Sequence, residues 1–247
     1  MKLTLADATY FKDSITIISE LVNEARFKVT KDGLELIAMD PANVAMVLYK
    51  LLASAFTEYD VEQDTVLAIN LPSLKQILRR ASASDILSLE VADNKLQITI
   101  RSDSVRKFSL PIIDIEERSE KIPNLSFPVV VKLPSSVLGS AIDDADIVGE
   151  SVSFIAEPEK FSVVAEGDTS KAHIEIPGTG ENKIKTETTA KIRSKYSLEY
   201  LKKMMPGAKL SSTVTISFNQ DYPLRLDYTV LDKVNLSFIL APRVEND

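Results

Sequence analysis

The chain has 247 residues, a formal net charge of −7 and a hydrophobic content of 45%. It has no Cys, which excludes a disulfide framework, a thiolate zinc site and a thiol nucleophile. No run of about 18 apolar residues occurs and no basic-flanked apolar segment lies at the N-terminus, so we expect a soluble, intracellular protein. Val, Ile and Leu alternate with polar residues over most of the chain, which favours antiparallel sheet.

Residues 1–113 are expected to form one domain. Apolar residues recur at helical spacing in Ala8–Val22, and a second helix is expected to begin at Leu71-Pro72, with Pro in its first turn. The Lys31-Asp32-Gly33 and Asp93-Asn94 segments are typical of tight turns. Strands are expected at Met1–Ala6, Glu24–Thr30, Leu34–Met39, Ala45–Ala53, Thr65–Ile69, Ile86–Ala92, Lys95–Arg101 and Val105–Ile112.

Residues 114–128 differ from the chain on either side of them. They are rich in charge, contain two prolines and include only four large apolar residues. Such a composition predicts an extended connector that lies on a surface.

Residues 129–247 repeat the order of the first domain. Helices are expected at Pro134–Ile147 and Ser197–Met205, and Gly178–Lys183 is expected to be a loop. Strands are expected at Val129–Leu133, Ser151–Ala156, Phe161–Glu166, Lys171–Ile176, Thr189–Ser194, Ser212–Asn219, Leu224–Leu231 and Asn235–Leu240. The sequence therefore predicts an α+β fold built from a duplicated domain.

Few residues of this chain suggest catalysis. The single His, His173, lies in an alternating strand-like run, and Gly178-Thr179-Gly180 lacks the third Gly and the helix of a phosphate loop. Asp143, Asp144 and Asp146 could suggest a divalent metal, but they fall on one helix without a second acidic motif. We expect no enzyme, no cofactor and no bound metal. The alternative of a metal-dependent phosphoryl-transfer enzyme would be exposed by a nuclease assay with magnesium or manganese.

Basic residues recur on one helix face in each half. Lys75, Arg79 and Arg80 share the polar side of one helix, and Lys202 and Lys203 lie on the corresponding helix of the second half. If both helices line one concave surface, that surface would hold a phosphate backbone without reading bases.

Several motifs resemble those of the proliferating cell nuclear antigen family, the ring-shaped sliding DNA clamps of archaea and eukaryotes. They are Gly33-Leu-Glu-Leu-Ile-Ala-Met-Asp-Pro41 in the first half, Ile122-Pro123 in the connector, and Leu210-Ser-Ser-Thr-Val-Thr-Ile-Ser-Phe218, Tyr222-Pro-Leu224 and Phe238-Ile-Leu-Ala-Pro-Arg-Val-Glu245 in the second half. The resemblance covers essentially the whole chain, including its duplicated order of elements.

The resemblance implies a trimeric ring, with two helices per domain inside and antiparallel sheets outside. It implies a processivity factor for DNA replication and repair that encircles duplex DNA. It also implies DNA polymerase, flap endonuclease, DNA ligase and a clamp loader as partners. Its location would be cytoplasmic in an archaeon or nuclear in a eukaryote. A clamp-like subunit for DNA-damage signalling is the alternative, and the intact Ile122-Pro123 and Ala241-Pro242 argue against it.

The same resemblance implies three groups of functional residues. The DNA-facing residues are Lys12, Lys75, Arg79, Arg80, Lys202 and Lys203. The pocket for partner peptides comprises Met39, Val44, Met46, Ile122, Pro123, Phe127, Pro223, Ile239, Leu240, Ala241, Pro242 and Val244. The subunit interface comprises Phe108, Leu110, Ile174 and Ile176, on strands that would pair with a neighbouring subunit.

Two departures from the family pattern are present. Asn43 replaces a His often found at the rim of the pocket. Ser140 and Asp143 replace residues that are commonly basic in rings of three identical subunits, and Asp144 and Asp146 add further negative charge. We therefore expect this chain to be one member of a ring of non-identical subunits.

Overall fold

The computed structural model describes residues 1–115, 121–187 and 189–243. These divide into two compact units. Unit 1 holds residues 1–41, 47–115 and 230–236, and unit 2 holds the remainder. Two strands are thus shared by the units, β4 (Ala45–Leu52) near the start of the chain and β18 (Val234–Leu240) near its end.

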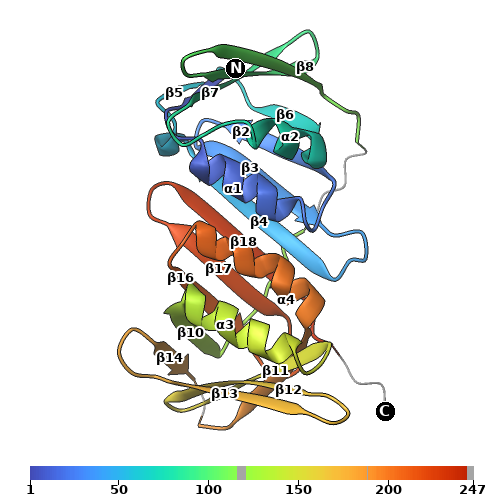
Figure 1. The fold of residues 1–247 in the computed structure, drawn as a ribbon, viewed down its shortest axis with the longest axis vertical. Helices are drawn as coiled ribbons and strands as arrows, with labels where there is room; N and C mark the ends of the chain where they lie inside the picture. The colour runs from blue at the N-terminus through green and yellow to red at the C-terminus, as the bar shows by residue number, and fades with distance from the viewer. Residues whose placement is uncertain (116–120, 188, 244–247) are drawn as a thin grey trace. The chain divides into compact units, whose positions relative to one another are not determined.

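Unit 1 contains two α-helices, α1 (Thr9–Ile18) and α2 (Leu71–Leu78), and a short 3-10 helix, η1 (Ala53–Ala55). Its other strands are β1 (Lys2–Leu5), β2 (Glu24–Thr30), β3 (Gly33–Met39), β5 (Glu58–Asp60), β6 (Thr65–Asn70), β7 (Ile86–Ala92), β8 (Lys95–Arg101) and β9 (Val105–Pro111). One antiparallel sheet has the order β5-β1-β7-β8-β9, and a second sheet runs β4-β3-β2-β6. Figure 1 shows α1 and α2 side by side, and the two helices are in contact.

The first-half strands follow from their alternating side chains. In β2 the residues Ala25, Phe27 and Val29 are buried, while the residues between them are half-buried or exposed. Gly33 begins β3 with φ of 153°, and a Cβ there would lie 2.3 Å from the carbonyl oxygen of Leu51. Asp93 and Asn94 both have positive φ, at 51° and 56°, as the tight turn between β7 and β8 requires.

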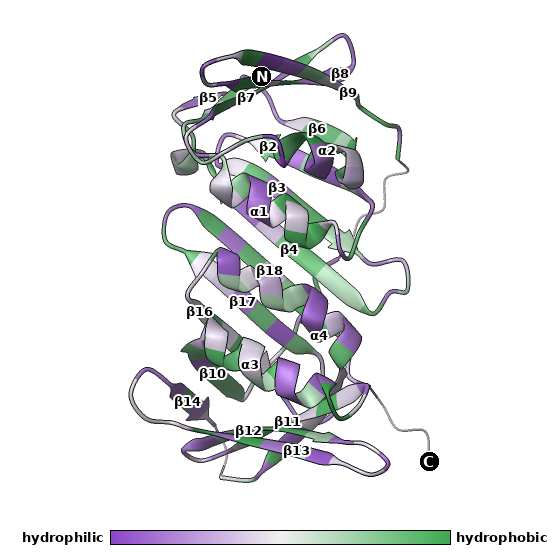
Figure 2. Ribbon diagram, in the orientation of Figure 1, coloured by the Kyte–Doolittle hydropathy of each residue, from purple (hydrophilic) through white to green (hydrophobic). Residues whose placement is uncertain are grey.

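Unit 2 contains α3 (Ser135–Asp146), α4 (Leu198–Met204) and a 3-10 helix, η2 (Met205–Lys209). Its other strands are β10 (Val129–Pro134), β11 (Ser151–Glu157), β12 (Lys160–Glu166), β13 (Lys171–Pro177), β14 (Lys183–Thr186), β15 (Ile192–Ser197), β16 (Thr213–Phe218) and β17 (Leu224–Val230). One sheet runs β14-β10-β16-β17-β18 and the other β13-β12-β11-β15. In β17, hydrophobic and hydrophilic residues alternate along the strand (Figure 2), so one face is buried and the other polar.

The two halves share their order of elements and their strand pairings. Each half reads strand, helix, five strands, helix and three strands. The pairs β1–β5, β1–β7 and β2–β6 of the first half correspond to β10–β14, β10–β16 and β11–β15 of the second. The predicted duplicated α+β fold is therefore confirmed.

The structure adds two strands that the sequence did not indicate. β5 and β14 have three and four residues, too few for alternation to stand out, and Lys183 was assigned to a loop. The helix predicted at Ala8–Val22 is also shorter, because α1 ends at Ile18 and the chain tightens there. The amide of Glu20 donates to the carbonyl of Ile17, three residues back, at 3.1 Å.

Candidate nucleic-acid interface and partner surface

The end of α2 carries two exposed arginines of unit 1. The Asn70 side chain caps this helix by accepting a hydrogen bond from the Ser73 amide at 3.0 Å, and Pro72 lies in the first turn as predicted. Leu74 and Leu78 are buried beneath the helix. The opposite, polar side therefore carries Lys75 toward the surface, and the helix ends at the exposed Arg79 and Arg80.

The predicted DNA-facing cations of unit 1 are not equally available. The ammonium group of Lys12 on α1 donates to the carbonyl of Ala81 at 2.7 Å, just beyond the end of α2. Lys75 pairs with the carboxylate of Glu20 at 2.6 Å. Within the part of the chain that the structure describes, neither the Arg79 nor the Arg80 guanidinium has a hydrogen-bond or ion-pair partner. Among the described residues, these two arginines are therefore the predicted DNA-facing cations of unit 1 whose charged groups have no partner.

In unit 2 the two predicted DNA-facing cations, both on α4, are matched by carboxylates. Lys202 on α4 pairs with Asp146 on α3, and Lys203 pairs with Glu199 one turn earlier at 2.8 Å. α3 contains three Asp and no Lys or Arg. Asp143 and Asp144 are exposed on its surface. The helices of unit 2 therefore offer less net positive charge than the end of α2.

The predicted partner surface in unit 2 combines the connector with the C-terminal end of β18. Ile122 is 50% exposed, although it is a large apolar residue. Phe127 packs edge-on against the ring of Tyr222, with the two centroids 6.1 Å apart. Ile239, Met46 and Leu240 are all buried, at 7%, 4% and 0% exposed, and would support the surface from beneath.

Hydrogen bonds fix the segments that carry this surface. The amide of Ala241 donates to the carbonyl of Val44 at 2.9 Å, and that of Arg243 donates to Lys195 at 2.7 Å, so the half-buried Pro242 is held between two backbone anchors. The hydroxyl of Tyr196 donates to the carbonyl of Tyr222 at 2.8 Å, beside the half-buried Pro223.

Three members of the predicted pocket need separate mention. Pro123 is exposed on the connector. Met39 belongs to unit 1, at the end of β3, and is half-buried. Val244 lies outside the described residues.

The predicted subunit-interface residues lie on two sheet edges. Phe108 and Leu110 are half-buried on β9, and they face the same side as the core residues Ile98 and Leu96 of β8. On β13, Ile174 and Ile176 are paired in the same way with Val163 and Phe161 of β12. Among the described residues, β9 and β13 each pair with a strand on one side only.

The described residues show little that suggests catalysis or membrane insertion. Within them no group of three or more His, Asp or Glu side chains is placed to hold a metal ion. His173 is 48% exposed and its imidazole lies 3.4 Å from the carboxylate of Glu175. No helix in the described ranges has the length and hydrophobicity needed to span a membrane.

Three exposed lysines on β10 and β14 were not among the predicted site residues: Lys132, Lys183 and Lys185. The signal that could have found them is the alternating Lys-Ile-Lys-Thr of residues 183–186.

Comparison with known proteins gives the same result for both halves. Residues 1–121 match the sequence model of the proliferating cell nuclear antigen N-terminal domain, and residues 121–243 match that of its C-terminal domain. A DNA polymerase sliding clamp of Thermococcus gammatolerans is 38% identical over 239 residues, which is 96% of each chain. That of Pyrococcus furiosus is 36% identical and spans 99% of this chain and 98% of its own.

A solved structure supports the fold over its full length. The crystal structure of PCNA from Thermococcus kodakaraensis matches with a TM-score of 0.91 and 30% identity, covering 98% of this chain and 99% of its own. Matching domain models in the expected order, relatives of equal length and a common fold leave one conclusion: this chain belongs to the proliferating cell nuclear antigen family.

Proposed function

We propose that this chain is a non-enzymatic subunit of a sliding DNA clamp, a ring that encircles duplex DNA and tethers replication and repair enzymes to it. DNA polymerase, flap endonuclease, DNA ligase and the clamp loader are its expected partners. The family of the chain supports this proposal, and one feature of the strand arrangement carries it. Two strands pair with each other within the chain, whereas the two strands that correspond to them in the other halves are edge strands.

The internal pair is formed by β4 and β18. In unit 1 the amide of Leu52 donates to the carbonyl of Lys233 at 2.9 Å, and in unit 2 the amide of Ala241 donates to that of Val44. By the duplicated order of elements, β4 corresponds to β13 and β18 corresponds to β9. β13 and β9 are both edge strands among the described residues, so the same pairing can form between β13 of one copy and β9 of the next.

The side chains of the two edges suit this pairing. Phe108 and Leu110 on β9 and Ile174 on β13 are only half-buried although they are apolar, so a neighbouring subunit would complete their burial. Ile176 is already buried at 4% and would continue the same row. Two different edges joined head to tail generate a closed ring when the rotation between copies closes.

Contact with DNA is proposed to be electrostatic and independent of sequence. Arg79 and Arg80 supply free guanidinium groups, while Lys12, Lys75, Lys202 and Lys203 would have to exchange a partner within the protein for a phosphate. Such contacts release counterions and weaken with salt. Retention on DNA would then depend on topology more than on affinity.

The topological mechanism predicts different retention on two DNA substrates. Once loaded, the ring should persist on closed circular duplex and should be lost when the circle is cut once, because a ring can slide off an end. The measurement is the fraction of labelled protein that stays with DNA after gel filtration in high salt. Equal retention on the circular and the cut duplex would refute the proposed mechanism.

A second prediction concerns the helix cations. Replacing Arg79 and Lys202 together with Ala should weaken binding to duplex DNA and lower the slope of log affinity against log salt by about one unit per lost phosphate contact. We expect most of the change from Arg79, because Lys202 already pairs with Asp146. Partner-peptide affinity serves as the control and should not change. A double variant with the salt slope of the parent would show that these side chains do not meet the duplex.

A further inference from the structure

The edge strand β14 carries an arrangement of lysines that sheet stability does not explain. Lys183 and Lys185 are both exposed and, being two residues apart, lie on the same face. The register places Lys132 of β10 directly opposite Lys183, and it too is exposed. Like charges directly opposite each other destabilise a strand pair.

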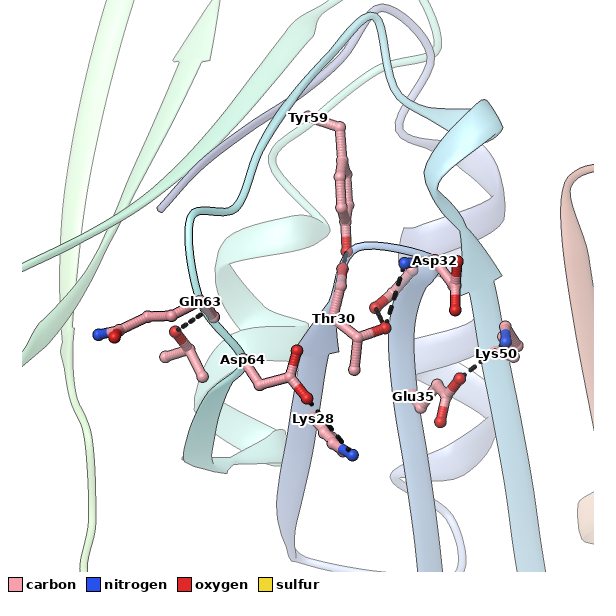
Figure 3. Close-up of polar contacts among 10 residues, drawn as sticks. Lys28, Thr30, Asp32, Glu35, Lys50, Tyr59, Gln63 and Asp64 are labelled. Atoms are coloured by element: carbon pink, nitrogen blue, oxygen red, sulfur yellow. Dashed lines mark hydrogen bonds and ion pairs between the residues drawn. The ribbon is translucent and has the colours of Figure 1, made fainter.

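These lysines also lack acidic partners. Across residues 1–115, 121–187 and 189–243, no ion pair involves Lys132, Lys183 or Lys185, although the Lys183 ammonium donates to the carbonyl of Gly180 at 2.9 Å. In unit 1, by contrast, strand lysines have acidic partners. Figure 3 shows Lys28 paired with Asp64 at 3.6 Å and Lys50 paired with Glu35 at 2.7 Å.

Nearby carboxylates also affect the pKa of Tyr59, which is drawn in Figure 3. Its hydroxyl donates a hydrogen bond to the carbonyl of Thr30 at 2.7 Å. Burial, followed by the charges of Glu35, Asp32 and Asp64, raises the pKa of Tyr59 to about 12. Lys28, Lys50 and Tyr59 of unit 1 thus lie near carboxylates, whereas no carboxylate of the described residues pairs with the β14 lysines.

The duplication supplies an internal comparison. β5 occupies in the first half the place that β14 occupies in the second, because each pairs with the first strand of its half. β5 carries Glu58 and Asp60 at alternate positions, where β14 carries Lys183 and Lys185. In unit 1, Lys2 of β1 pairs with Glu58 at 2.9 Å, and this hydrogen bond lowers the pKa of the Glu58 carboxyl. Unit 1 thus already contains an acidic strand, β5, that pairs with a strand carrying a lysine, and one of its carboxylates binds that lysine.

The backbone of β14 is open on the side away from β10. The Glu187 amide donates to the carbonyl of Pro128 at 2.9 Å, and hydrogen-bonded pairs alternate along an antiparallel ladder. Lys185 and Lys183 therefore direct their amides and carbonyls toward β10. Those of Ile184 and Thr186 point outward, to the edge where no further strand is paired among the described residues.

We propose that the β14 edge, formed by the outward backbone of Ile184 and Thr186 and the side chains of Lys132, Lys183 and Lys185, binds an extended acidic peptide of a partner protein as an added strand. Residues of that peptide opposite Lys183 and Lys185 would occupy non-hydrogen-bonded pairs, where side chains approach most closely. Carboxylates at alternate positions therefore fit. Nucleic acid could satisfy the charges but has no amide ladder for the open backbone.

The test uses the assembled full-length chain and a fluorescein-labelled peptide of repeated Val-Glu, followed by anisotropy. One control peptide has the same composition with its Glu residues consecutive, and another has its outward amides N-methylated. We expect the alternating peptide to bind most tightly and its affinity to fall with salt. A duplex oligonucleotide is titrated in parallel.

Two variants separate charge from backbone. Lys185→Glu should weaken peptide binding about fivefold or more, whereas Lys95→Glu, which makes the same charge change at an exposed strand position of unit 1, should not alter it. Thr186→Pro should abolish binding while Thr186→Val retains it, because Pro removes an amide that points away from β10 and leaves the β10–β14 ladder intact.

The proposal is overturned by any of three results: no binding of the alternating peptide at millimolar concentration, equal binding of the peptide with consecutive Glu, or unchanged affinity in Thr186→Pro. Loss of only oligonucleotide binding in Lys185→Glu would assign these lysines to phosphate instead. None of these measurements depends on loading of the ring, so the proposal can fail while the clamp function stands.

Discussion

Replacing Ile122 with glutamate is expected to weaken the binding of partner peptides by about 30-fold or more, which corresponds to roughly 2 kcal/mol. Ile122 is 50% exposed on the connector, so its apolar side chain is available for contact with a partner peptide. A carboxylate there would lose apolar contact with the peptide and would have to be desolvated when the peptide binds. Calorimetry with a polymerase-derived peptide measures the change.

The same surface provides a second variant and a matched control. Pro242→Glu should act in the same direction, because Pro242 lies between the anchored Ala241 and Arg243. Ile147→Glu introduces the same charge at an apolar residue that is 83% exposed at the end of α3, outside the predicted pocket, and should leave affinity unchanged. All three variants should assemble normally. If Ile122→Glu and Pro242→Glu both bound peptide like the parent, the pocket would lie elsewhere.

Purified alone at micromolar concentration, this chain should not form a stable closed ring of three copies. The reason is the charge on α3, where Asp143 and Asp144 are exposed and where, within the described ranges, only Asp146 has an ion-pair partner, Lys202. If α3 faces the DNA, three copies would repeat these carboxylates around the channel and oppose the phosphate backbone. Companion subunits with cations at the position of Asp143 and Asp144 would reduce this repulsion. We then expect β9 and β13 to pair with the edge strands of those companion subunits in preference to copies of this chain.

Light scattering coupled to gel filtration measures the mass of the particle and therefore the number of chains in it. We expect less than three copies for the chain alone and three chains per particle when companion subunits are added. A polymerase assay supplies the functional comparison under the same conditions. A homotrimer that is stable at micromolar concentration and stimulates a polymerase unaided would refute the mixed ring.

Local periodicity was sufficient for most of the fold. Three first-half strands, Glu24–Thr30, Ile86–Ala92 and Lys95–Arg101, have the predicted bounds, because each has seven residues of alternating burial. The four helices were predicted with differences at their ends, since caps and final turns depend on short-range contacts. The duplication was visible because it repeats the order of these strong local signals.

The sequence also determined the family, because its motifs lie in both halves and in the connector between them. It could not determine which of the predicted DNA-facing cations form ion pairs within the protein. Lys75 meets Glu20 across 55 residues of sequence, and Lys202 meets Asp146 across 56. The first pair joins α2 to the turn after α1, and the second joins α4 to α3, so only tertiary packing brings each lysine to its carboxylate. Arg79 and Arg80 remain free because no acidic side chain of the described chain is folded against them.

Short strands were decided by tertiary structure alone. β5 and β14 exist because β1 and β10 offer open backbone hydrogen bonds to segments more than fifty residues away. A strand of three or four residues has too little intrinsic preference to form without such a partner. Elements that carry their own periodic pattern could therefore be predicted from the amino-acid sequence. Tertiary structure decided the elements and charges whose stability comes from a distant partner.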